Sequence, residues 1–401
     1  MADDQQSLSP KSQPRLRIVH VLRQPLGGLF RHVCDLAEGQ RALGHEVGVI
    51  CCEAEGAVAS QMMKVLEGNA SLGIHFIRIS RLPGISDIWT LTYISKLMSR
   101  LAPDIVHGHG AKGGAYARLL SSSRGLRRIY TPHGGSLHFS PDTFQGWAYL
   151  SLERFLMRRS HGILFESRFG QATFETKVAK LNVPHAVVHN GVAQSEFDLV
   201  SPFADASDLV FIGELRELKG IGTLLEALRF IGRHISLRIV GSGPDRDAFE
   251  ALALEMPHHV RVAFLGAMPA RKAFALGRIV VMPSHAESLP YIALEAIAAG
   301  RPLIATRVGG VAEIYGDHAE GLIPAGDPVA LRTAIKAVLD DPVATEARAK
   351  ALREHVRRHF STLQMVQRVD AFYAQVLSSR PAPQSNKHRR SKAPLVSSQG
   401  E

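Results

Sequence analysis

Cysteine is scarce in this 401-residue chain, which contains only Cys34, Cys51 and Cys52. Three thiols are too few for a disulfide framework, and Cys51 and Cys52 are neighbours in a predicted strand, where they cannot easily bridge each other. This usage indicates a reduced, cytosolic protein. No group of His and Cys residues has the spacing of a zinc site either.

Long apolar runs are missing as well. No stretch approaches the ~20 consecutive apolar residues that cross a bilayer. Residues 1–14 lack the apolar core of a signal peptide, and we expect them, like the polar tail 379–401, to be disordered. The sequence therefore predicts a cytoplasmic protein that meets a membrane, if at all, peripherally on the inner face of the cytoplasmic membrane.

The net charge of +10 is unevenly distributed. Residues 1–200 contain 22 Lys/Arg against 16 Asp/Glu, residues 201–378 contain 20 against 20, and residues 379–401 contain five against one, which gives +6, zero and +4. A basic first half and tail favour an anionic acceptor or an anionic membrane surface. Nucleic acid would be attracted by the same charge, but no aromatic ladder or binding module accompanies it, so we expect no nucleic-acid partner.

Short apolar runs alternate with helical patterns, which is typical of parallel sheets covered by helices on both faces. The chain is also longer than one core usually supports, so two α/β domains are predicted. Twelve strands are expected, at 15–22, 45–52, 74–80, 104–109, 127–132, 162–167, 185–190, 208–213, 236–241, 260–266, 279–284 and 302–306. The expected units are two facing, doubly wound Rossmann-like domains at 15–195 and 196–360, and a helix at 361–378 that crosses back onto the first. Ligands of such sheets bind at the carboxyl ends of the strands.

The strongest motif is IVVMPSHAESLPYIALEAIAAG at 279–300. A buried strand is followed by a short loop with Glu287 and then by a helix. The positive end of the helix dipole and the free amides of Ser288, Leu289 and Tyr291 could hold an anion there.

Glu295 follows Glu287 by eight residues, about two helical turns along the same face. A carboxylate at this position could accept hydrogen bonds from the two hydroxyls of a ribose. The plainer alternative is that Glu287 only caps the helix and that Glu295 is a solvated surface residue. The spacing, the buried strand before it and the run of small residues after it favour the functional interpretation.

ESLPYIALEA resembles the E-x7-E motif of the retaining glycosyltransferases of the GT-B fold, specifically family 4 (glycosyltransferase group 1). The resemblance extends over nearly all of residues 15–378. It implies two facing domains with a central cleft, a nucleotide-sugar as donor, and neither a metal nor another cofactor. It also implies that Glu295 binds the ribose, that Glu287 contacts the donor sugar, and that nearby amides hold the diphosphate.

A second motif, FIGELRELKGIGTLLEAL at 211–228, places Lys219 and Gly220 between a strand and a helix. A cation there suits a diphosphate whose negative charge rises as it leaves. The family pattern resembles G-R-x…K-G, in which both the Arg and the Lys contact the diphosphate. Lys219 matches, whereas Glu214 occupies the position of the Arg. Either Arg216 takes over, or one donor contact is missing.

The first strand-to-helix loop contains Gly27-Gly28, which lacks the spacing of a dinucleotide fingerprint, so a nicotinamide cofactor is not indicated. The resemblance places Gly28 beside the donor phosphates. It also places His133, in YTPHGGS, near the donor sugar, as a catalytic candidate together with Lys219 and Glu287. His109 and Lys112 are expected on the acceptor side, whereas His107 is more typical of an ordinary loop histidine.

Two further patterns remain ambiguous. In TRVGGVAEI at 306–314, Glu313 either positions the nucleotide or simply begins a helix. Asp245 and Asp247 satisfy the D-x-D pattern that holds a divalent ion in other glycosyltransferases. They open a predicted helix, however, so we interpret them as helix-capping residues.

No Asp or Glu at a strand end of the first domain stands out as a base for an inverting reaction, which favours retention. The expected function is therefore a metal-independent hexosyltransferase that uses a UDP- or GDP-sugar. Alternatives are a nucleotide-sugar epimerase, a phosphorylase (for which no pyridoxal lysine site is found), or a non-catalytic basic scaffold.

The acceptor is expected to be a glycan or glycolipid, such as a bacterial cell-envelope, exopolysaccharide or lipopolysaccharide precursor, although small acceptors also occur in the family. FQGWAYLSLERFLMRRS at 144–160 mixes apolar residues with Arg154, Arg158 and Arg159. It could rest on an anionic membrane, but a half-buried core helix is the interpretation we favour.

Overall fold

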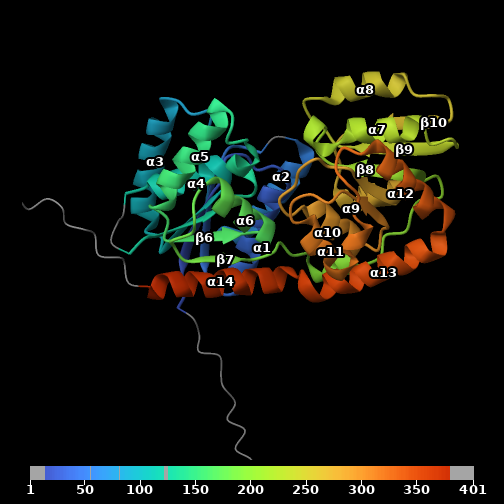
Figure 1. Cartoon of the computed structure of the whole chain (residues 1–401). Coiled ribbons are helices and arrows are strands. Elements are labelled where there is room, and N and C mark those ends of the chain that lie inside the picture. The colour runs from blue at the N-terminus through green and yellow to red at the C-terminus, as the bar shows by residue number, and fades with distance from the viewer. Residues whose placement is uncertain (1–13, 55, 81, 122–124, 380–401) are drawn as a thin grey trace, which may run out of the picture.

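The structure is a computed structural model that describes residues 14–54, 56–80, 82–121 and 125–379. The expected disorder of the N-terminus and of the tail therefore falls almost entirely outside the described residues. Two α/β domains stand side by side, and the chain passes from one to the other and back (Figure 1).

The first domain is built on a seven-stranded parallel sheet with the order β3-β2-β1-β4-β5-β6-β7. Its strands are β1 (Arg17–Val21), β2 (Glu46–Cys51), β3 (Ile74–Phe76), β4 (Ile105–His109), β5 (Arg127–Thr131), β6 (Gly162–Phe165) and β7 (His185–Val187). The order reverses between β1 and β4, as in a doubly wound sheet. Strands β4 and β6 are buried along their whole length, because helices cover both faces.

The second domain has a five-stranded parallel sheet with the order β10-β9-β8-β11-β12. Its strands are β8 (Ser207–Ile212), β9 (Ile235–Val240), β10 (Val260–Phe264), β11 (Gly277–Met282) and β12 (Leu303–Ala305). Each of the twelve predicted strand ranges overlaps one of these strands. The predicted fold class, two doubly wound α/β sheets, is confirmed.

Several helices begin after a polar residue whose side chain accepts a hydrogen bond from an amide of the first turn. The helices of the first domain are α1 (Gly27–Ala42), α2 (Ala57–Asn69), α3 (Ser86–Leu101), α4 (Gly110–Leu119), α5 (Phe144–Met157) and α6 (Arg168–Lys177). Those of the second are α7 (Ile221–Arg229), α8 (Arg246–Leu254), α9 (Ala270–Ala273), α10 (Tyr291–Ala298), α11 (Val311–Tyr315), α12 (Pro328–Asp340) and α13 (Pro342–His359). Side-chain caps are clear at Ser167, whose hydroxyl accepts from the Gly170 amide, and at Asp327, which precedes a proline at the first helical position.

The last helix, α14 (Thr362–Ser378), runs back along the first domain (Figure 1). Its apolar side chains join Ile18 and Leu36 in one buried cluster, and Asp370 pairs with His45 at 2.8 Å. A Cβ at Gly39 of α1 would lie 2.4 Å from Val366, so the absence of a side chain there lets the two helices approach closely. Within the described residues, no helix is both long and apolar enough to span a membrane.

Candidate active site

A cavity of about 400 Å³ lies between the two domains, at the carboxyl ends of both sheets. The first domain contributes the loops that follow β5 and β6 and part of α6, whereas the second contributes the loops that follow β11 and β12. His133 and Glu166 line the first side, and Glu287 and Ser288 line the second. The volume is within the usual range of small-molecule sites.

Glu287 is held in place by two donors of its own domain. Its Oε1 accepts hydrogen bonds from Ser284 Oγ at 2.7 Å and from Lys219 Nζ at 2.6 Å. Lys219 does not line the cavity itself, but its ammonium group contacts the carboxylate that does. The pair therefore places an anion at one wall of the cavity and a cation in contact with it, which suit hydroxyl groups and a diphosphate respectively.

Two glycines explain why these loops can pack so closely. Gly220, next to Lys219, has a φ of +71°, and a Cβ there would lie 2.0 Å from the Pro283 carbonyl oxygen. Gly309 has a φ of +54°, and its Cβ would lie 2.0 Å from the Glu287 carbonyl oxygen. Both positions combine left-handed backbone with direct main-chain contact, so only glycine fits them without strain.

The backbone before α10 has the features of an anion site. Within the described part of the chain, no residue accepts a hydrogen bond from the amides of Ser288, Leu289 or Tyr291. They lie at the positive end of a helix dipole, next to the cavity. The side chains of Leu289 and Tyr291 are buried and do not line the cavity, so any contribution of these two residues comes from their backbone.

Glu295 does not reach the cavity in this structure. Its Oε1 accepts a hydrogen bond from Arg31 Nη1 of α1 at 2.7 Å, and the same guanidinium binds Glu196 at 2.7 Å and Asp35 at 2.9 Å. Burial raises the pKa of Glu295 to about 7, against the attraction of Arg31. Its binding to ribose thus stays a prediction, and in this conformation the carboxylate belongs to the interface between the domains.

Gly28 lies at the same interface. A Cβ there would stand 3.3 Å from Tyr291 Cδ2, so the absence of a side chain lets the start of α1 approach α10. Gly28 is not among the residues that line the cavity. Its proximity to the donor phosphates therefore also remains a prediction.

His133 lies on the cavity wall in an unusual conformation. Its φ of 51° is left-handed, which is uncommon for a residue other than glycine. Its Nδ1 lies 2.8 Å from Glu166 Oε1, and its Nε2 lies 3.0 Å from His109 Nδ1. Because both ring nitrogens are engaged within the protein, the ring has no nitrogen free for a sugar hydroxyl in this conformation.

Glu166 is the residue that the sequence interpretation missed. It directly follows β6, lines the cavity and is 6% exposed. The sequence interpretation nominated no acidic residue at a strand end of the first domain, and Glu166 occupies such a position. Burial opposes the ionisation of Glu166. This effect is outweighed by the imidazoles of His133 and His32 and by the hydrogen bonds from His133 and Asn190, which together lower the pKa of Glu166 to about 2. A carboxylate immediately after the buried run GILF was the signal that could have revealed it.

The remaining candidates lie apart from the cavity. The Arg216 guanidinium is 3.6 Å from the Glu214 carboxylate, both side chains are largely exposed, and neither residue lines the cavity. Lys112 pairs with Asp87 at 2.7 Å. His109 is 1% exposed and lies behind His133, and neither His109 nor Lys112 lines this cavity. Their place on the acceptor side stays a prediction.

Glu313 lies in the first turn of α11, and its role toward the nucleotide stays a prediction. Its carboxylate accepts hydrogen bonds from the Arg168 and Phe169 amides at 2.8 and 2.9 Å, and it pairs with His189 at 2.8 Å. It thus caps the start of α6 in the other domain. Asp245 accepts from the Glu217 amide at 2.7 Å and makes no side-chain cap to its own helix α8, so this part of the capping interpretation was wrong.

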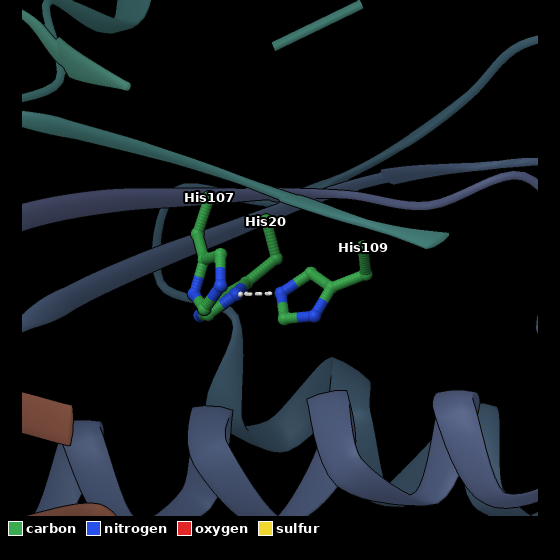
Figure 2. A group of neighbouring side chains, drawn as sticks. All are labelled: His20, His107 and His109. Atoms are coloured by element: carbon green, nitrogen blue, oxygen red, sulfur yellow. Dashed lines mark hydrogen bonds between the residues drawn. The ribbon is translucent and has the colours of Figure 1, made fainter. Parts of the chain in front are cut away.

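Buried histidines extend behind His133. His20 and His107 are register partners on β1 and β4, and His109 is two residues beyond His107, so the three side chains share one face of the sheet (Figure 2). Ring nitrogens of the three lie within 4.8 Å of one another, a spacing that also suits a metal ion.

The nitrogens, however, already have partners. His20 contacts His109 at 2.9 Å and Gln40 at 2.8 Å, and His107 contacts Tyr373 at 2.7 Å and Thr131 at 2.8 Å. Burial lowers the pKa of His20 to about 4. We therefore interpret the cluster as a hydrogen-bonded network of mainly neutral rings.

Comparisons with known proteins find matches to both domains of the chain. The model for Glycosyltransferase Family 4 matches residues 26–196, and the model for glycosyl transferases group 1 matches residues 206–341. The chain is 28% identical over 375 residues to a glycogen synthase of Mycobacterium tuberculosis, covering 84% of this chain and 88% of the relative. It is 28% identical over 335 residues to a 2-deoxystreptamine glucosyltransferase of Streptomyces kanamyceticus, covering 75% and 85%.

Two further similarities are one of sequence, over part of the chain, and one of fold. A lipopolysaccharide core biosynthesis glycosyltransferase, LpsD of Rhizobium meliloti, is 32% identical over 166 residues, covering 41% of this chain and 48% of the relative. The crystal structure of Anabaena HepE in complex with UDP-glucose aligns with a TM-score of 0.76 at 16% identity, over 90% of this chain and all of the other.

Proposed function

This chain belongs to the glycosyltransferases of group 1 and family 4, and from that premise we propose that it transfers a hexose from a UDP- or GDP-sugar with retention of configuration and without a metal ion. The observation that carries the proposal is the contact between Lys219 Nζ and Glu287 Oε1 at the wall of the interdomain cavity. It combines a cation for the diphosphate with a carboxylate for the sugar hydroxyls.

The residues of the second domain would stabilise the leaving group. As the bond between the anomeric carbon and the phosphate oxygen breaks, negative charge gathers on the diphosphate. Lys219 and the amides of Ser288, Leu289 and Tyr291 can stabilise that charge, and the start of α10 adds its dipole. The acceptor oxygen bonds to the anomeric carbon on the same face, and its proton passes to the departing phosphate.

Glu166 is an acidic residue at the position where an inverting enzyme would have its base, so its basicity decides whether it counts against retention. Its pKa of about 2 makes it a weak base. His133, Asn190 and Ser288 already donate to its two oxygens. A group that is this strongly acidic is poorly matched to taking a proton from an acceptor hydroxyl near neutral pH, which supports retention.

Ribose binding by Glu295 requires an exchange of partners. In this conformation its carboxylate is bound to Arg31. We propose that the ribose hydroxyls replace Arg31 when the donor binds. The interface between α1 and α10 would then rearrange along with the cavity.

For the acceptor we propose a glycolipid precursor of the cell envelope, reached at an anionic membrane surface. The exposed side of α3 carries Ile88 and Trp89, 66% and 75% exposed, and that of α5 carries Phe144 and Trp147, 83% and 61% exposed. Both helices pack against α4, on the first domain (Figure 1). Helix α5 is half-buried, with Leu150 and Leu156 in the core, so its exposed aromatic side chains are not needed for packing.

The donor is tested by a thermal-shift screen with UDP-, GDP-, ADP- and TDP-sugars, followed by analysis of the products. One of these donors should raise the melting temperature, and its nucleoside diphosphate should be released. An epimerised nucleotide-sugar in place of a transferred sugar would point to the epimerase alternative. Stabilisation by none of the donors, with no release of a nucleoside diphosphate, would contradict the proposal.

A further inference from the structure

The carboxylate of Glu166 spans the two domains. In the first domain it accepts from His133 Nδ1 at 2.8 Å and from Asn190 Nδ2 at 2.8 Å. From the second domain it accepts from Ser288 Oγ at 3.0 Å. Ser288 is the neighbour of Glu287, so one buried group contacts both the His133 loop and the loop expected to hold the donor.

Glu166 also determines the tautomer of His133. An ionised carboxylate only accepts hydrogen bonds, so the proton between them must sit on His133 Nδ1. The opposite nitrogen, Nε2, faces His109 Nδ1 at 3.0 Å, and the line continues through His20 to Gln40. Gln40 Oε1 can only accept, so His20 Nε2 donates to it. Glu166 requires the Nδ1 proton of His133 whichever ring donates between His133 and His109.

The backbone of His133 needs such support. Its left-handed φ of 51° is disfavoured for a residue with a Cβ, and such conformations persist where the surroundings hold them in place. Here the ring is held at both nitrogens, by Glu166 on one side and His109 on the other. Removal of the Glu166 charge would weaken one of these two contacts.

We propose that Glu166 is a positioning residue that fixes the orientation and tautomer of His133 and couples both to closure of the two domains through Ser288. This inference rests on the proposed sugar transfer, for which His133 forms part of the cavity wall. When the domains separate, the carboxylate loses Ser288 as a donor and becomes exposed to water. Closure completes its hydrogen bonds and holds the His133 ring in one position.

A matched pair of variants tests the inference. Glu166→Gln keeps the size of the side chain but removes the charge. Glu313→Gln changes another carboxylate that joins the two domains, to the Arg168 and Phe169 amides, but that has no contact with His133. Three quantities are measured for each: nitrogen-15 NMR shifts of His133, an interdomain distance between two attached spin labels, and kcat and KM for the donor.

We expect Glu166→Gln to change the Nδ1 signal of His133. We also expect it to lower kcat on the order of 100-fold, the effect that a small displacement of an active-site group can produce. The donor KM should change much less. Glu313→Gln should broaden the interdomain distance while the His133 signal stays as in the wild type. Ser288→Ala serves as a second variant, and it should broaden the distance while keeping the Nδ1 proton.

An unchanged His133 signal and kcat in Glu166→Gln would overturn the positioning role and leave the transferase proposal intact. Equal changes in the His133 signal for Glu313→Gln and Glu166→Gln would overturn it too, because a general loosening would then explain both. If the wild type releases no nucleoside diphosphate from any donor, the proposed function fails. The NMR and distance measurements would still decide whether Glu166 links His133 to closure.

Discussion

Replacement of Glu295 by Gln should stabilise the protein at pH 8, although it removes one partner of a buried ion pair. Arg31 is shared by Glu295, Glu196 and Asp35, so one cation faces three carboxylates at the interface. Burial outweighs the attraction of Arg31 and raises the pKa of Glu295 from 4.5 to about 7. The ionised carboxylate therefore costs folding free energy when the pH is above this value.

The sign and magnitude follow from proton linkage. Below pH 4.5 the carboxyl is protonated in both the folded and the unfolded protein, and it contributes no pH dependence. Between pH 4.5 and 7 the unfolded chain loses the proton while the folded protein keeps it, so stability falls, and the loss is complete above pH 7. A shift of this size corresponds to about 3 kcal/mol. Gln cannot ionise, so the free energy of unfolding of Glu295→Gln, relative to that of the wild type, should rise by about this amount as the pH increases from 4.5 to 8.

The assay is urea denaturation followed by circular dichroism at pH 5 and pH 8, because both tryptophans, Trp89 and Trp147, are exposed and report folding poorly. Glu313→Gln is the control with the opposite sign. Hydrogen bonds from His189 and two amides oppose burial and lower the pKa of Glu313, so this variant should be destabilised at pH 8 and less so as the pH falls. If Glu295→Gln is clearly destabilised at pH 8, Glu295 is a net stabilising ion-pair partner and the reasoning is refuted.

Three further predictions concern the cavity and the surface. Gly220→Ala should destabilise the second domain by roughly 1–3 kcal/mol and weaken donor binding, because its Cβ would meet a carbonyl oxygen. Thermal unfolding with and without UDP measures both effects, and an unchanged melting temperature would contradict this prediction. Glu287→Gln should lower the rate of sugar transfer, whereas UDP alone should bind to it at least as tightly as to the wild type, because Lys219 loses its competing partner. Calorimetry measures the UDP affinity, and weaker UDP binding would place Glu287 on the nucleotide instead. Changing Trp89 and Trp147 together to Ser should reduce sedimentation with anionic vesicles but not the melting temperature, and undiminished sedimentation would exclude this surface.

Much of the fold could be predicted from the sequence because buried parallel strands are short, continuous apolar runs. All twelve strands, and the loops that follow them, came from that pattern. Glu287 and Lys219 could be identified because each lies in a segment between a strand and the next long helix, which the sequence pattern marks. Their direct contact could not be predicted, since it depends on a close approach that Gly220 and Gly309 allow.

The features that were missed depend on contacts between distant parts of the chain. Arg31 is four residues from Asp35, which reads as a solvated pair on a helix, yet it binds Glu295 across 264 positions. His107 was interpreted as an ordinary loop histidine, but it is a buried residue of β4. His109 was expected on the acceptor side, and the register of β4 with β5 buries it behind His133. Glu166 had a local signal, the end of a buried strand, but its role depends on Ser288 in the other domain.

The central claim is that Glu287 at the cavity wall and its partner Lys219 carry out sugar transfer. The most direct measurement is the rate of nucleoside diphosphate release from the preferred donor by the wild type, Lys219→Ala and Lys272→Ala. Lys272 is an exposed lysine of the same domain and serves as the matched control. We predict on the order of a 100-fold loss for Lys219→Ala, in line with loss of a charge that stabilises the transition state, and near wild-type rates for Lys272→Ala. Equal rates for Lys219→Ala and the wild type, with both proteins folded, would contradict the account.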